Sequence, residues 1–213
     1  MMDACCQPVA SGVSNPAVRR MLWTVLAVNA AMFVAEGSAG IATGSLALTA
    51  DSLDFFAEAA TYAVSLFVLS RSLTWRAGAA LAKGSGMLAF GVAILVAAAA
   101  SFASGAPPAH TTMGAVGALA LAVNVACAAL LYRFRGAEAN LRSAWLCSRN
   151  DAIGNLAVLA AAVGVWGTAT HWPDVIVGVG MATLAIVAAV QVIRQAIGEI
   201  ADARRAIPVV TVR

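Results

Sequence analysis

The sequence predicts an all-α integral membrane protein with six transmembrane helices. Of its 213 residues, 62% are hydrophobic and only 11% are charged, and the mean hydropathy of +0.87 is too high for a soluble domain of this size. Apolar windows of about 20 residues, the length that crosses roughly 30 Å of hydrocarbon, occur six times. Short polar segments separate these windows. Together the patterns indicate a helical bundle within a lipid bilayer.

The six spans follow one another with little intervening sequence. We expect helices at residues 21–42, 46–69, 77–103, 113–132, 143–165 and 175–197. Glycine, serine and proline between them, as in Thr43-Gly44-Ser45, are typical of turns. The first span is too long for the apolar core of a signal peptide, and no convincing cleavage site lies near its end. We therefore expect this span to be retained.

The basic residues predict the orientation of the bundle. The loops on one side contain neither Lys nor Arg, and Lys83 lies near the other side. Nearly all arginines map to that other side: Arg19, Arg20, Arg71, Arg76, Arg133, Arg135, Arg142, Arg194, Arg204, Arg205 and Arg213. By the positive-inside rule, both termini are cytoplasmic. We expect an N-terminal tail at residues 1–18, the transmembrane domain at 19–199 and a short C-terminal tail at 200–213. Arg149 falls within a span, and its long side chain is expected to extend towards the cytoplasmic headgroups.

The second span contains three carboxylates in an otherwise apolar segment. Asp54 and Glu58 are four residues apart, so they share one face of a helix. Burying an ionised carboxylate in hydrocarbon costs roughly 2.5 to 3.5 kcal/mol, so such a pair needs a cation, a proton or water. The pattern therefore predicts an ion site.

The fifth span repeats this spacing with a different set of donors. Cys147, Asp151 and Asn155 follow one another at intervals of four residues and lie on one helix face. Two pairs of donors from two helices give four oxygen and sulfur ligands, which suit a tetrahedral divalent transition metal, with zinc as the default. The alternative is that these side chains only hydrogen-bond between helices. The same spacing on two helices favours a metal site.

Other polar residues have weaker signals. In the first span, Asn29 and Glu36 lie on one face of the expected helix. One interpretation is that they support the metal site or relay protons to it. The alternative is that Glu36 is an interfacial residue near the outer end of the span. Asn124 and Cys127 in the fourth span are expected to serve helix packing. Cys5 and Cys6 either capture a soft metal or belong to an ordinary tail. The four cysteines form no pattern typical of a disulfide framework.

Two motifs carry a resemblance to a known family. Gly44-Ser45-Leu46-Ala47-Leu48-Thr49-Ala50-Asp51-Ser52-Leu53 precedes Asp54, and Ser143-Ala144-Trp145-Leu146 precedes Cys147. With these motifs the chain resembles the cation diffusion facilitator family of divalent metal-ion transporters over about residues 19–199. The resemblance implies that Asp54, Glu58, Cys147 and Asp151 are the transport ligands. It places Asp51 outside this set, so Asp51, like Asn155, is expected to support the ligands or relay protons.

The sequence departs from the family pattern in three ways. Glu58 stands where the family usually has Asp, and its longer side chain needs a wider helix spacing or a bent rotamer. Cys147 stands where the family usually has His, which favours softer ions such as zinc or cadmium over manganese or magnesium. Many members also continue into a cytoplasmic metal-binding domain, whereas we expect a short form without it.

The resemblance implies a secondary transporter that exports zinc, cadmium or cobalt from the cytoplasm across a bacterial inner membrane. Protons compete for carboxylate and thiolate ligands, which provides a basis for proton antiport. We expect a homodimer, no prosthetic group, no nucleic-acid partner and no enzymatic activity. One alternative is a membrane protein that binds or senses metal at the same residues without transporting it. A membrane metalloenzyme would need an open coordination position, which four protein ligands do not leave.

Overall fold

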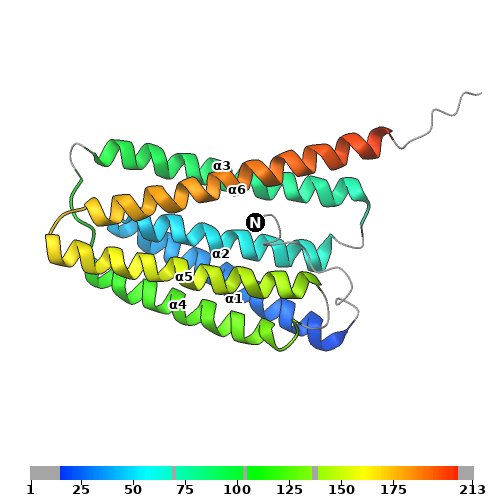
Figure 1. Cartoon of the computed structure of the whole chain (residues 1–213), viewed down its shortest axis with the longest axis horizontal. Helices are drawn as coiled ribbons and strands as arrows, with labels where there is room; N and C mark the ends of the chain where they lie inside the picture. Colours follow the sequence, from blue (N-terminus) through cyan, green and yellow to red (C-terminus); the bar gives the residue numbers. More distant parts are fainter. Residues whose placement is uncertain (1–14, 69–70, 103–104, 136–138, 206–213) are drawn as a thin grey trace, which may run out of the picture.

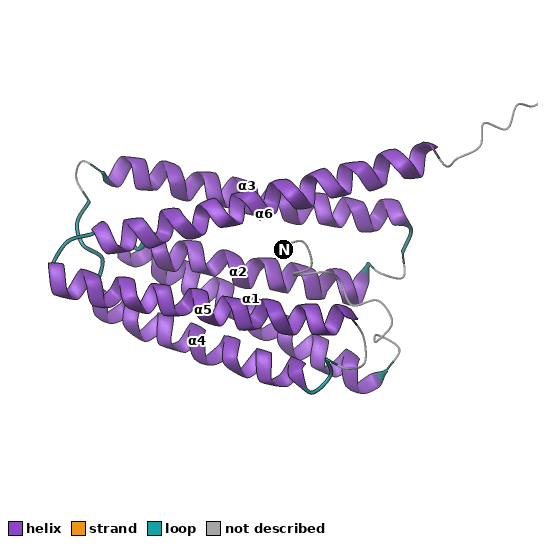
Figure 2. Cartoon of the chain, in the orientation of Figure 1, coloured by secondary structure: helices purple, strands orange, loops and turns teal. Residues whose placement is uncertain are grey.

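The computed structural model describes residues 15–68, 71–102, 105–135 and 139–205. It contains six helices: α1 (Pro16–Thr43), α2 (Leu46–Phe67), α3 (Leu73–Ser101), α4 (His110–Tyr132), α5 (Ala139–Thr168) and α6 (Trp172–Arg205). No strand occurs in the described ranges, which confirms the predicted all-α class. Successive helices run in opposite directions along the long axis, so α1 begins and α6 ends at the same end of the bundle (Figures 1 and 2).

Local sequence explains how α1 starts and stops. Asn15 accepts a hydrogen bond from the Ala17 amide at 2.9 Å, and Pro16 occupies the first turn, where its missing N–H is tolerated. Gly44 follows the helix with φ of 70°, a left-handed conformation that favours glycine. This turn lets Ser45 donate its amide to the Gly40 carbonyl at 2.9 Å before α2 begins.

Five helices, namely α1, α3, α4, α5 and α6, are long and apolar enough to cross a membrane. The remaining helix, α2, has 22 residues and carries three carboxylates, Asp51, Asp54 and Glu58, in its central part. It contacts every other helix. The helix that carries these carboxylates therefore lies at the centre of the bundle, where its polar side chains meet protein.

Close contacts organise the helices into pairs, with α1 beside α2, α3 beside α6 and α4 beside α5. Figure 1 shows α3 and α6 together along one edge of the bundle. A Cβ atom on Gly84 of α3 would lie 2.8 Å from Ile193 of α6, and one on Gly178 of α6 would lie 2.7 Å from the Leu46 backbone of α2. Both glycines therefore permit close helix approach within the chain.

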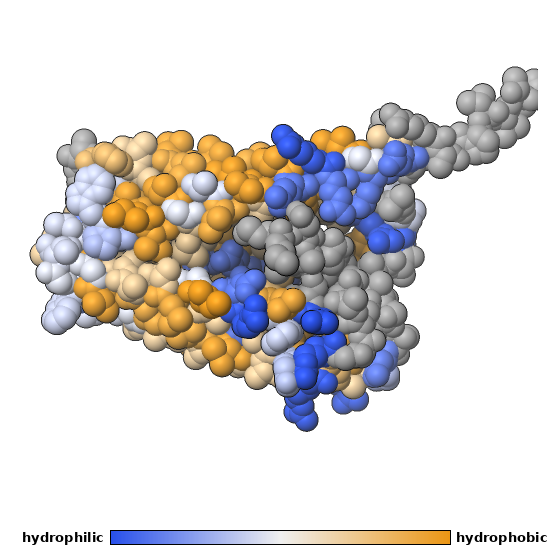
Figure 3. Space-filling view, in the orientation of Figure 1, coloured by the Kyte–Doolittle hydropathy of each residue, from blue (hydrophilic) through white to orange (hydrophobic). Residues whose placement is uncertain are grey.

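The described arginines lie at one end of the bundle. They occur at the start of α1, α3 and α5 and at the end of α4 and α6, and Figure 3 shows the hydrophilic surface concentrated towards this end. Arg149 is exposed, and its guanidinium lies 5.6 Å from the Trp145 ring centroid. This arrangement matches the predicted alternation of the spans.

Candidate metal site between α2 and α5

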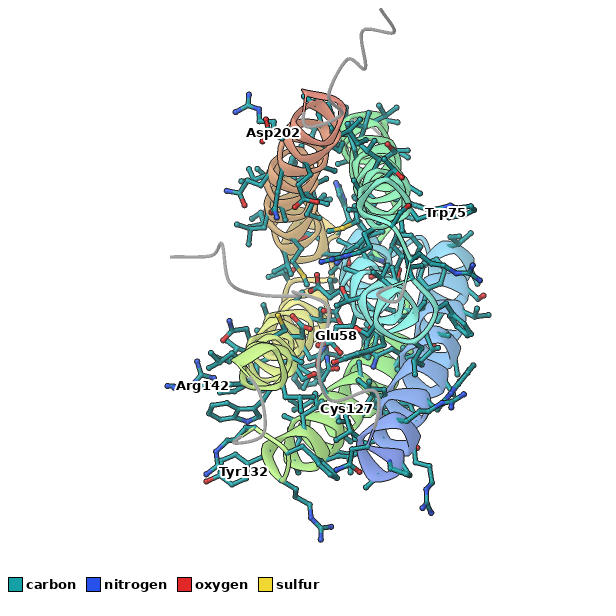
Figure 4. The ribbon with its side chains drawn as sticks, turned by 90° about the vertical axis from the view of Figure 1, so that its right-hand side faces the viewer. Glu58, Trp75, Cys127, Tyr132, Arg142 and Asp202 are labelled. Atoms are coloured by element: carbon teal, nitrogen blue, oxygen red, sulfur yellow. The ribbon has the colours of Figure 1, made fainter. Side chains whose placement is uncertain are left out.

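The carboxylates of α2 point into the bundle towards α5. Asp51 is 0% exposed, Glu58 is 2% exposed and Asp54 is half-buried. A Cβ atom on Gly154 of α5 would lie 3.7 Å from Asp51 Oδ1 and 4.0 Å from Asp54 Oδ2. In Figure 4, Glu58 lies in the interior among side chains of the surrounding helices. Three acidic groups are therefore enclosed at one helix interface.

Two side chains of α5 hold these carboxylates in place. Ser148 Oγ donates to Glu58 Oε1 at 2.7 Å, and Asn155 Nδ2 donates to Asp51 Oδ2 at 2.5 Å. Asp151, between them on the same helix face, lies close enough to interact with Glu58. The predicted polar face of α5 thus does meet the carboxylates of α2. Ser148 was not predicted, because it lies beside the regular four-residue spacing rather than on it.

The second carboxylate oxygen of Glu58 also accepts a hydrogen bond. Tyr62, one turn further along α2, donates its hydroxyl to Glu58 Oε2 at 3.3 Å. Hydrogen bonds to both oxygens restrict rotation of the carboxylate and orient its remaining lone pairs. The orientation of the Glu58 carboxylate is therefore fixed by hydrogen bonds from α2 and α5.

The four predicted ligands do not form a compact cluster. Cys147 is 3% exposed and forms no disulfide, and Asp151 is half-buried. Within the described ranges, no group of three or more His, Cys, Asp or Glu side chains is arranged to hold a metal ion. The assignment of Asp54, Glu58, Cys147 and Asp151 as ligands therefore stays a prediction.

A second buried polar cluster adjoins the first. Asn124 of α4 donates to Asn155 Oδ1 at 3.0 Å, so a chain of hydrogen bonds runs from α4 through α5 to Asp51 of α2. Glu36 of α1 is 0% exposed, both its oxygens lack a hydrogen-bond partner, and it lies close enough to Asp51 to interact. The structure therefore brings Glu36, Asp51 and Asn155 together, and their role beside the metal site stays a prediction. Asn124 belongs with them, although its sequence position suggested only helix packing.

The remaining predicted residues lie elsewhere. Asn29 is 0% exposed on the same face of α1 as Glu36, but it donates to the Val25 carbonyl of its own helix at 2.7 Å and lies beside Cys127. Cys5 and Cys6 lie outside the described residues.

Asp174 of α6 holds the start of α2 in place through hydrogen bonds. This carboxylate at the start of α6 is 1% exposed, and it accepts hydrogen bonds from Ser45 Oγ at 2.6 Å, the Leu46 amide at 2.8 Å and the Ala47 amide at 3.0 Å. The two amides are backbone donors that have no partner within the helix at its start, where a negative charge is also favourable. Asp174 therefore joins α6 to the helix that carries the candidate ligands.

Comparisons with known proteins agree with this architecture. The sequence profile of the cation efflux transmembrane domain matches residues 22–201. Relatives include the metal cation efflux system protein CzcD of Cupriavidus metallidurans and the cation efflux system protein CzcD of an Alcaligenes species. Each is 26% identical over 167 residues, which cover 73% of this chain and 53% of the relative. The chain thus spans about half the length of these relatives.

The profile match covers most of the chain and extends from α1 into α6. The motifs in α2 and α5 that resemble cation diffusion facilitators fall inside the matched region. Together with five helices that are long and apolar enough to cross a bilayer, the match identifies a multi-pass membrane protein. The chain belongs to the cation efflux family, the cation diffusion facilitators.

Proposed function

We propose that the chain exports a divalent transition-metal cation from the cytoplasm, with Asp54, Glu58, Cys147 and Asp151 as ligands. The observation that carries this proposal is the set of acidic α2 side chains facing the polar surface of α5 inside a membrane bundle. Charged groups are retained at such depth where they bind or move ions. Family membership supports the same activity, since the named relatives are efflux proteins.

The donor set favours zinc as the substrate, followed by cadmium and cobalt. Carboxylates and a thiolate suit borderline and soft ions, whereas magnesium and manganese prefer oxygen donors alone. Asp51, Glu36 and Asn155 would keep the α2 carboxylates in place and pass protons to them, and Asn29 would act further along α1. The Cys5-Cys6 pair would deliver metal from the cytoplasm.

Proton antiport follows from competition for the same ligands. A metal ion displaces protons from carboxylates and a thiol when it binds, and protons entering from the opposite side displace the metal in turn. Alternating access would be a movement of the closely packed α3–α6 pair against the other helices. We place the protein in the bacterial plasma membrane as a homodimer, with both termini in the cytoplasm.

A second candidate function is metal binding or sensing without transport. Such a protein would use the same four candidate ligands, Asp54, Glu58, Cys147 and Asp151, so the site residues alone are compatible with both functions. Metal flux distinguishes the two functions, because a sensor binds metal without moving it. An enzymatic function has less support, because the matched family is named for cation efflux.

Metal uptake into inverted membrane vesicles tests the proposal. Zinc, cadmium, cobalt and manganese would be compared for the unaltered chain, Asp54→Ala and Cys147→His, with Cys127→Ser as the control for loss of a buried thiol. We expect saturable zinc flux that Asp54→Ala abolishes, Cys127→Ser retains and Cys147→His shifts in selectivity. Metal binding without flux by the unaltered chain would contradict transport and support the sensor.

A further inference from the structure

Lys83 is the only lysine of the chain, and it lies where α3 contacts α2. It is ten residues into α3 and half-buried. Its Nζ donates a hydrogen bond to Thr61 Oγ1 of α2 at 2.7 Å, and Thr61 is only 4% exposed. The ammonium group is therefore directed at α2 rather than at the lipid.

This contact brings a positive charge close to the candidate metal site. Thr61 is three residues after Glu58, so the two side chains lie one above the other on the same face of α2. The charge of Lys83 is close enough to act on Glu58. Asp54 and Asp151 in turn lie near Glu58, so the carboxylate that Lys83 acts on belongs to the candidate ligand group.

The lysine is attached to a helix pair that is distinct from α2. On α3, a Cβ atom on Gly84 would lie 2.8 Å from Ile193 of α6, and one on Gly91 would lie 2.7 Å from Ile186. These close approaches make α3 and α6 a tightly packed unit. A movement of this unit against α2 would therefore change the distance between the ammonium group and the carboxylates.

We propose that Lys83 is a tethered counter-cation of the transport site. In the metal-free state its positive charge offsets part of the negative charge of Glu58 and of the carboxylates beside it. When a divalent cation is bound, the same charge repels it and promotes its release. This inference rests on the proposed transport function. It gives Lys83 a role in both the affinity for metal and the rate of transport.

A purely structural lysine predicts a different result. If Lys83 only joins α3 to α2 through Thr61, its loss loosens the site, so metal binding weakens and flux falls with it. If Lys83 acts through its charge, its loss strengthens metal binding while release becomes slower. The directions of change in affinity and maximal rate therefore separate the two roles.

The test compares the full chain with Lys83→Gln and Lys83→Arg, using equilibrium zinc binding and zinc flux in proteoliposomes. Arg76→Gln serves as the control, because it removes an exposed cation from the same helix. Coulomb repulsion between a unit charge and a divalent ion at close range predicts at least about tenfold tighter zinc binding by Lys83→Gln. We expect its apparent KM and maximal flux both to fall, while Lys83→Arg and Arg76→Gln stay near the unaltered chain.

Unchanged or weaker zinc binding by Lys83→Gln, with normal flux in the unaltered chain, would overturn this inference alone. The same holds if Lys83→Arg, which keeps the charge, binds zinc as tightly as Lys83→Gln. Absence of zinc binding and flux in the unaltered chain would overturn the proposed function, and this inference with it.

Discussion

The contact between Asp174 and the start of α2 predicts a large loss of stability when the carboxylate is removed. Asp174→Ala leaves the Leu46 and Ala47 amides and the Ser45 hydroxyl without their acceptor at a buried helix end. Asp174→Asn keeps one acceptor oxygen but places an amide donor against these donors and removes the negative charge. We therefore expect both variants to be destabilised, the alanine variant more strongly.

The magnitude follows from the groups that lose their partner. A buried polar group left unsatisfied costs about 1 to 3 kcal/mol, and loss of a helix N-cap costs about 1 kcal/mol. Water can replace the carboxylate as acceptor for some of these donors in the variant. We therefore expect the free energy of unfolding to fall by about 3 kcal/mol for Asp174→Ala and by about half of that for Asp174→Asn. Such a loss is a large fraction of the typical 5 to 15 kcal/mol of a folded domain.

The assay is reversible unfolding in mixed micelles by titration with dodecyl sulfate, followed by far-ultraviolet circular dichroism. Asp202→Ala removes an exposed carboxylate from the same helix and is the matched control, with an expected change within about 0.5 kcal/mol. A loss below about 1 kcal/mol for Asp174→Ala, or one equal to that of the control, would show that Asp174 does not hold α2 to α6.

Three further predictions concern packing and metal binding. Gly178→Ala places a Cβ atom 2.7 Å from the Leu46 backbone and should cost about 1 to 3 kcal/mol in the same unfolding assay, whereas Gly180→Ala, with no atom within 4 Å, should not destabilise. Ser148→Ala removes the 2.7 Å hydrogen bond to Glu58 and should weaken equilibrium zinc binding about tenfold. Lowering the pH by one unit should weaken zinc binding about tenfold per displaced proton, and a pH-independent affinity would contradict proton exchange.

The helices and the polar faces of α2 and α5 could be predicted because they depend on local periodicity. Each predicted span overlaps one observed helix. The ends of the predicted spans differ from the observed helix ends. Hydropathy marks only the apolar part of a helix, whereas backbone hydrogen bonding continues past that part. The last predicted span stops at residue 197, whereas α6 continues to Arg205, with Gln195 donating to Glu199 at 3.0 Å.

The contacts that position the candidate site could not be predicted in this way. Asp174 and Ser45 are 129 residues apart, and no local pattern shows that the start of α6 meets the start of α2. Lys83 and Thr61 are 22 residues apart on different helices, and the sequence indicated only that Lys83 lies near the basic side. Helix spacing shows which residues share a face, but the packing of the bundle decides which faces meet.

The most direct test of the central claim is X-ray absorption at the zinc edge of the metal-loaded protein. The protein would have Cys5 and Cys6 replaced by serine, which leaves the buried thiols of Cys127 and Cys147. We predict one sulfur ligand at about 2.3 Å together with oxygen ligands at about 2.0 to 2.2 Å. The sulfur signal should disappear in Cys147→Ser and persist in Cys127→Ser. Sulfur coordination that survives Cys147→Ser, or its absence before this change, would contradict a metal site shared by α2 and α5 through this thiolate.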